Sequence, residues 1–146
     1  GTDSWGTEGE GQVYVFLGVG ELEGDVSTED ADLTISEGSY PFFGTGLVAA
    51  NLDGDDHADL VITAPGSRLY DDELEHRGVA YIFYGASMTG ASDLVAGDAD
   101  AFITGGEDQF GNGLAAGDLD SDGLDELLIA SPRYDGEEGR VWIFSH

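Results

Sequence analysis

The sequence contains no cysteine, no lysine and only three prolines among its 146 residues. Without cysteine the chain has neither disulfides nor thiolate metal sites, and its redox compartment stays undecided. It has four arginines against a formal net charge of −27, so it lacks the basic residues that nucleic acids and anionic membrane surfaces require. It also lacks an apolar run long enough to span a bilayer. We therefore expect no nucleic-acid partner and no membrane insertion.

Acidic residues, glycine and short apolar runs are abundant instead. There are 31 acidic residues and 24 glycines, and hydrophobic residues make up 40% of the sequence. This apolar fraction is sufficient for a core, so the chain is not a disordered acidic tail. The aromatic and β-branched residues gather in short runs between glycine-rich turns. That pattern predicts an all-β fold, and the length predicts a single domain.

Two nine-residue loops place acidic side chains in the same order. They span residues 51–59 and 118–126, and each has an oxygen-bearing side chain at loop positions 1, 3, 5 and 9. Hard cations such as Ca²⁺ take about six to eight oxygen ligands, and a main-chain carbonyl at position 7 is a usual addition. The candidate metal ligands are therefore Asn51, Asp53, Asp55, His57 and Asp59 in the first loop, and Asp118, Asp120, Asp122, Leu124 and Glu126 in the second. His57 and Leu124 would contribute main-chain oxygens.

The alternative for both loops is an ordinary solvated turn, because Asp and Gly are common turn formers. Repetition of one spacing in matching contexts favours two calcium sites over that alternative. An EF-hand is excluded, since its bidentate glutamate stands at loop position 12, which here is Ile62 or Ile129. For the carboxylates outside the loops, solubility or salt adaptation is an equally good explanation.

Four sequence elements recur in the same order at nearly the same offset. Phe43-Gly44 and Phe110-Gly111 each precede an acidic loop and stand 110 − 43 = 67 residues apart. The second element is an apolar run after the loop, at residues 60–65 and 127–132. The third is an aromatic run, at residues 11–18, 78–85 and 139–144. The fourth is an Asp-Ala-Asp element, at residues 30–35 and 98–103. Such a repeat of four short strands predicts the blades of a β-propeller.

At these residues the chain resembles the FG-GAP repeat family. That family forms the seven-bladed propeller at the head of integrin α subunits and recurs in bacterial surface and secreted proteins. The two Phe-Gly pairs go with Thr63-Ala64-Pro65 and Ala130-Ser131-Pro132. The family's calcium loop, Asp-x-Asp/Asn-x-Asp/Asn-Gly-x-x-Asp, matches both acidic loops. Asn51 and Asp56 depart from it in the first loop and Glu126 in the second.

The fold class expected is therefore all-β: a β-propeller segment of four-stranded antiparallel blades, with a calcium-binding loop between the first and second strands of a blade. Residues 1–36 are expected to supply the last two strands of a preceding blade, 43–104 a complete blade and 110–146 three strands of the next. About two blades and part of a third do not close a ring. Either the chain is a segment of a larger propeller, which is the favoured alternative, or further copies complete it. The apolar residues expected to lack partners at the outer faces are Val13, Val15, Leu127, Ile129, Val141 and Ile143.

The resemblance implies a non-enzymatic, calcium-stabilised module of an extracellular, secreted or cell-surface protein. It would act in adhesion or scaffolding through loop contacts with protein or glycan. Two alternatives stay open: an accessory module of a secreted hydrolase whose catalytic residues lie outside this chain, and a purely structural acidic module. Catalysis has little support, because the three histidines lie apart and there is no Gly-x-Ser-x-Gly elbow. Arg68 and Tyr70 stand in a loop suited to partner contact, with a solvated loop as the alternative.

Overall fold

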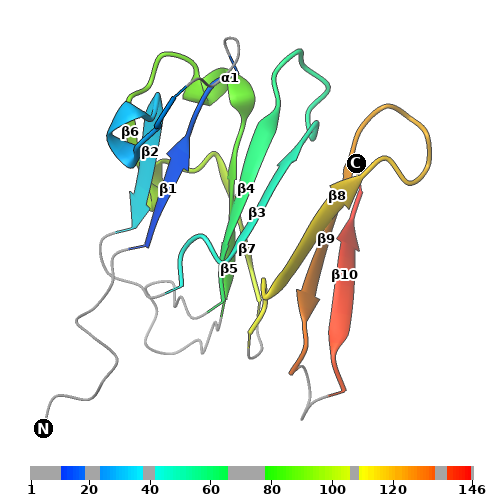
Figure 1. The fold of residues 1–146 in the computed structure, drawn as a ribbon. Coiled ribbons are helices and arrows are strands. Elements are labelled where there is room, and N and C mark those ends of the chain that lie inside the picture. Colours follow the sequence, from blue (N-terminus) through cyan, green and yellow to red (C-terminus); the bar gives the residue numbers. More distant parts are fainter. Residues whose placement is uncertain are drawn as a thin grey trace, which may run out of the picture.

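The computed structural model describes residues 11–18, 24–37, 42–65, 78–105, 109–133 and 138–145. These residues form three β-sheets set beside one another like the blades of a fan (Figure 1). Arg68 and Tyr70, the candidates for partner contact, lie outside the described residues. No helix within the described ranges is long and apolar enough to cross a membrane.

The middle sheet is a complete four-stranded blade. Its strands are antiparallel in the order β3 (Gly46–Ala50), β4 (Asp59–Ala64), β5 (Val79–Phe83) and β7 (Ala101–Thr104). The third sheet has three antiparallel strands in the order β8 (Gly113–Gly117), β9 (Glu126–Ser131) and β10 (Arg140–Phe144). Gly46 pairs with Thr63 as Gly113 pairs with Ala130, so the two sheets share one register at the repeat offset. The predicted class of antiparallel propeller blades is confirmed.

The first sheet contains a strand that the sequence did not predict. β1 (Gly11–Val15) pairs antiparallel with β2 (Leu33–Glu37), and β6 (Asp93–Val95) then pairs parallel with β2. β6 belongs to the connection between β5 and β7, together with the short helix α1 (Gly85–Met88). The connection between two strands of the middle blade therefore contributes β6 to the first sheet. Three residues are too few to show a strand periodicity, which is why the sequence gives no signal for β6.

Two cores lie between the three sheets. One lies between the first and middle sheets and includes Ile35 and Tyr81, and the other lies between the middle and third sheets and includes Ile82 and Phe110. All five residues of β5 are buried, because successive side chains of this central strand enter opposite cores. The middle blade is thus covered on both faces.

The burial pattern corrects part of the expectation about unpartnered residues. Val13, Leu127 and Ile129 are buried inside the cores, and Val15 packs against the first core. Only Val141 and Ile143 of the expected set are exposed, each by 58%. The expectation was wrong for the other four, because a shift of one residue along a strand moves a side chain to the opposite face.

The Phe-Gly signature forms a tight turn at the junction between neighbouring sheets. Phe110 is buried, and Gly111 has a φ of 88°, which favours glycine. The Gly111 N–H donates to the Ala130 carbonyl (3.1 Å), and the Thr63 hydroxyl of the middle blade donates to the Gly111 carbonyl (2.6 Å). The turn at 43–44 has the same left-handed glycine. The motif therefore joins one blade to the next.

The repeated Asp-Ala-Asp element also has a structural role. Asp30 and Asp98 each close a 3₁₀ helix, at Thr28–Asp30 and Ala96–Asp98. The four aspartates of the two elements accept main-chain N–H groups at 2.8–2.9 Å, from Ser27, Leu17, Val95 and Tyr84. The Ser27 N–H and hydroxyl also hold the pKa of Asp30 below its usual value. These carboxylates stabilise turns, so this part of the acidity has a structural role.

Candidate metal centres

The two acidic loops occupy equivalent places in two blades. Residues 51–58 connect β3 to β4, and residues 118–125 connect β8 to β9. Both connections therefore join the first and second strands of a sheet. Figure 1 shows both loops at the same end of the fan. The location predicted from the repeat is confirmed.

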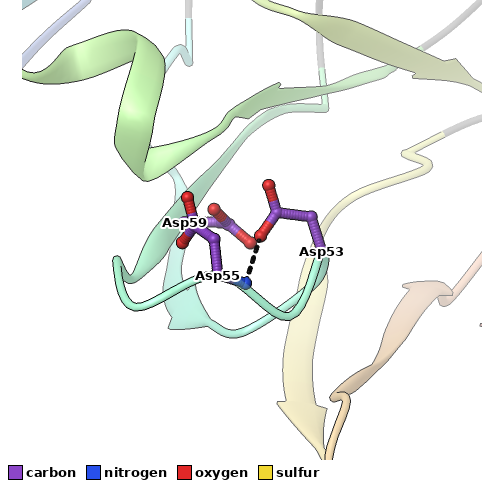
Figure 2. A group of neighbouring side chains, drawn as sticks. All are labelled: Asp53, Asp55 and Asp59. Carbon is purple, nitrogen blue, oxygen red and sulfur yellow. Dashed lines mark hydrogen bonds between the residues drawn. The ribbon is translucent and has the colours of Figure 1, made fainter.

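Three carboxylates converge in the first loop. Asp53, Asp55 and Asp59 each offer an oxygen atom, and these three oxygens lie within 4.8 Å of one another. Figure 2 shows the three side chains gathered on the inside of the turn. Asp53 is exposed, whereas Asp59 is fully buried at the start of β4. Like charges this close repel one another strongly, so the arrangement favours a cation between them.

Main-chain N–H groups hold this first triad in place. The two oxygens of Asp59 accept the N–H groups of Leu52 (2.7 Å) and of Gly85 (2.9 Å), the latter at the start of α1. Asp53 and Asp55 each accept the N–H group two residues further on, at 3.0 and 2.6 Å. Such side-chain-to-main-chain bonds fold an Asp-rich turn without any metal. The loop is therefore pre-shaped, with Asp59 anchored to two elements.

Asn51 and His57, the other two predicted ligands of this loop, have different surroundings. The Asn51 side-chain oxygen accepts the Gly54 N–H (3.0 Å). The His57 Nδ1 lies 3.3 Å from a carboxylate oxygen of Asp55. His57 also donates its main-chain N–H to Asp55. Their roles as metal ligands, through the Asn51 side chain and the His57 carbonyl, remain predictions.

The second loop gathers three carboxylates in a similar way. Oxygens of Asp118, Asp120 and Glu126 lie within 4.8 Å of one another. Glu126 is 3% exposed and accepts the Leu119 N–H (2.6 Å), as Asp59 accepts that of Leu52. Glu126 has a longer side chain than Asp59, yet it accepts the main-chain N–H at the same loop position.

The remaining two candidates of the second loop lie outside that triad. Asp122 accepts the Leu124 N–H at 2.8 Å and is not among the three converging carboxylates. This contact repeats the one between Asp55 and His57 at the same loop positions. Calcium binding by the Asp122 carboxylate and by the Leu124 main-chain oxygen remains a prediction.

The loop backbones explain the departure at Asp56. At position 4 both loops turn left-handed, with a φ of 80° at Gly54 and 67° at Ser121. At position 6 the second loop has Gly123 with a φ of 95°, whereas Asp56 in the first loop has no positive φ. The first loop therefore needs no glycine at position 6. This difference in backbone cannot be read from the motif alone.

The donor chemistry of both triads suits a hard divalent cation. All six groups are carboxylates, and hard cations such as Ca²⁺ prefer oxygen ligands. Two oxygens bound to one Ca²⁺ at about 2.3–2.6 Å cannot lie more than about 5 Å apart. The 4.8 Å limit within each triad is compatible with a single shared ion. The residues present therefore fit calcium.

Comparison with known families decides what kind of repeat this is. The FG-GAP repeat model matches residues 43–83 and 110–144, which together make up more than half of the chain. This chain belongs to the FG-GAP repeat family. Both matched segments contain a complete acidic loop with its flanking strands. The family predicted from the Phe-Gly turns and the calcium-loop pattern is confirmed.

Individual relatives include integrin α subunits and one phospholipase. The FG-GAP chain is 29% identical over 150 residues to integrin alpha-4 of Xenopus laevis, across 94% of its own length. It is 33% identical over 112 residues to integrin alpha-5 of the same species, across 71%. It is also 26% identical over 129 residues to phosphatidylinositol-glycan-specific phospholipase D of Rattus norvegicus, across 84%. It spans only 10–14% of the length of these three proteins.

Proposed function

We propose that this FG-GAP chain is a non-enzymatic, calcium-binding β-propeller module of an extracellular, secreted or cell-surface protein. It would serve adhesion or scaffolding through loop contacts with protein or glycan. The observation that carries the proposal is the pair of carboxylate triads at equivalent places in two blades. The similarity to integrin α subunits supports the cell-surface setting. Extracellular modules bind Ca²⁺ with Kd values as weak as about 10⁻⁴–10⁻³ M, which loops of this kind can reach.

Each loop would hold one Ca²⁺ through the predicted ligands at positions 1, 3, 5, 7 and 9. The second loop offers four carboxylates at these positions, whereas the first offers three and the neutral Asn51. Because ligand charge is one of the terms that set calcium affinity, we expect the second loop to bind more tightly. The bound ions would remove the repulsion within each triad.

Calorimetric titration with Ca²⁺ tests this assignment. We expect two binding events per chain. Asp53→Ala should remove the weaker event and Asp120→Ala the tighter one, since both residues occupy position 3 of their loops and belong to the triads. Asp25→Ala, at an exposed aspartate outside both loops, is the control and should keep both events. No binding in the wild-type chain would refute the proposal, and loss of the tighter event in Asp53→Ala would reverse the ranking.

A second candidate is an accessory module of a secreted hydrolase. The similarity to a phosphatidylinositol-glycan-specific phospholipase D favours it. In that case the catalytic residues would lie outside this chain, and the flanking reading frame would encode a hydrolase domain. A purely structural calcium module is the third candidate. Binding to a protein or glycan array in Ca²⁺, with loss of binding in EDTA, would support adhesion over the structural candidate.

A further inference from the structure

The two acidic loops contact each other through a reciprocal pair of hydrogen bonds. The Asn51 N–H donates to the carboxylate of Asp125 (2.8 Å), and the Asp125 N–H donates to the Asn51 carbonyl (2.8 Å). The side-chain amide of Asn51 also donates to the Gly123 carbonyl (3.2 Å). We call these three bonds the loop bridge. It joins the first loop of the middle blade to the second loop of the next blade.

Asp125 is a carboxylate that the metal-loop pattern does not use. It occupies position 8 of the second loop, immediately before Glu126, and belongs to neither triad. The first loop has Ala58 at the same position. At position 8 only the second loop has a carboxylate, and this carboxylate accepts a main-chain N–H group of the first loop.

The loop bridge fixes the residue at position 1 of the first loop. Both main-chain polar groups of Asn51 bond to Asp125, while its side-chain oxygen accepts the Gly54 N–H within its own loop. A Cβ atom added to Gly54 would lie 3.1 Å from a methyl group of Leu124, so the two loops also pack closely. Asn51 is thus held by Gly123 and Asp125 of the second loop together with Gly54 of its own loop.

The same bridge lies beside the ions that the loops are proposed to hold. An open hollow of about 380 Å³ is lined by Asp55 of the first triad and by Asp125, among others. In the second loop, Gly123 and Asp125 flank Leu124, the predicted main-chain ligand, and Asp125 precedes the triad member Glu126. An ion that orders residues 123–126 therefore also orders the Gly123 carbonyl and the Asp125 carboxylate, which bond to Asn51.

We infer that Asp125 couples the two calcium sites, so that each bound ion raises the affinity of the other loop. This inference rests on the proposed calcium function of both loops. An ion in the second loop orders residues 122–126, and the loop bridge transmits that order to Asn51. The first loop then loses less conformational freedom when it binds its own ion. Coupling between binding sites is reciprocal by thermodynamic necessity, so an ion in the first loop also strengthens the second site. Asp125 is a positioning residue in this account and not a ligand.

Calcium titration of the full chain in a double-mutant cycle measures the coupling. Asp120→Ala disables the second loop, and we expect it to weaken binding at the first loop about five- to tenfold. Asp125→Ala removes the side-chain bond of the loop bridge, so in this background the same Asp120→Ala change should weaken first-loop binding less than it does in the wild-type chain. Asp25→Ala removes one exposed charge outside both loops and should preserve the coupling. An equal effect of Asp120→Ala in every background would overturn the inference.

Asp125→Asn separates hydrogen bonding from charge. Asparagine keeps a side-chain oxygen for the Asn51 N–H but carries no charge, so this variant should retain the coupling. It also keeps the test decisive if Asp125→Ala does not fold. Loss of coupling in Asp125→Asn would overturn the role of the hydrogen-bonded bridge.

The amide resonance of Asn51 gives a second, direct measurement. In an Asp53→Ala protein only the second loop binds Ca²⁺, and filling it should shift the Asn51 amide signal by NMR. An unchanged signal would overturn the inference. A wild-type chain that binds two ions independently would overturn the coupling alone. A chain that binds none would overturn the proposed calcium function as well.

Discussion

Asp59 and Asp53 belong to the same triad but have opposite surroundings. Asp59 is fully buried and accepts two main-chain N–H groups, whereas Asp53 is exposed and accepts one. In EDTA we therefore expect Asp59→Ala to lower the free energy of unfolding by about 2–4 kcal/mol, because two buried donors lose their acceptor. Asp53→Ala should change it by less than about 0.5 kcal/mol, as is usual for an exposed site. Urea unfolding of both variants without metal checks this.

In excess Ca²⁺ each variant should also lose the stabilisation that an ion gives to the first loop, because each lacks one carboxylate of that triad. A matching loss of stability for both variants in EDTA would contradict the structural role of Asp59. The sequence identified both residues as candidate ligands, since the spacing of the loop is visible in it. It did not distinguish them, because one of the two N–H groups that Asp59 accepts belongs to Gly85, 26 residues further along the chain.

Gly111 and Gly117 also differ in ways that the sequence does not show. Gly111 has a φ of 88°, and an added Cβ would lie 2.9 Å from the Thr63 Cβ of the middle blade. Gly117, at the end of β8, has no atom within 4 Å of the added Cβ. We expect Gly111→Ala to destabilise the chain by about 2–4 kcal/mol, from the left-handed backbone and the overpacking together.

Gly117→Ala is the matched control for this change. It should be neutral or stabilise the protein by up to about 1 kcal/mol, because alanine restricts the unfolded chain. Thermal unfolding of the two variants gives the comparison. Equal melting temperatures for Gly111→Ala and Gly117→Ala would show that the Phe-Gly turn does not stabilise the contact between the third sheet and the middle blade.

At the scale of elements, β10 is a strand with adjacent exposed apolar side chains at the end of the third sheet. Val141 and Ile143 point away from the core that Trp142 contacts, and each is 58% exposed. Exposed apolar strands promote association between sheets. We expect light scattering to show self-association of the chain in Ca²⁺, and Val141→Thr/Ile143→Thr to reduce it. The control is Leu17→Thr/Val26→Thr, which changes two exposed residues outside the strands and should leave association unchanged.

A monodisperse wild-type monomer would contradict this prediction for β10. The same element shows the limit of prediction from the sequence. Repetition predicted the strands and both loops, because a repeated pattern identifies an element even when each copy is short. It did not predict which face of β9 is buried, and it gave no sign that β6 joins the first sheet. Both features depend on contacts between blades, which the spacing of residues along the chain does not encode.

At the scale of the whole molecule, the net negative charge lowers the stability of the folded chain, and bound calcium would offset part of that effect. The chain has a formal net charge of −27, and six of its carboxylates converge in two triads at one end of the fan. Repulsion between these groups destabilises the folded chain when no cation is bound, and salt weakens that repulsion. Bound Ca²⁺ would remove it locally and stabilise the two blades whose loops meet at Asn51 and Asp125. Calcium would therefore act mainly as a structural ion.

The thermal unfolding of the chain in Ca²⁺ and in EDTA at low ionic strength tests this account most directly. At 100-fold over Kd, each site should add about 2.7 kcal/mol to the folded state, which raises Tm by several degrees or more. Magnesium at the same concentration should raise Tm much less, because it demands tight octahedral geometry, and sodium chloride should partly rescue the EDTA sample. An identical Tm in Ca²⁺ and in EDTA would contradict the claim that the acidic loops are calcium sites.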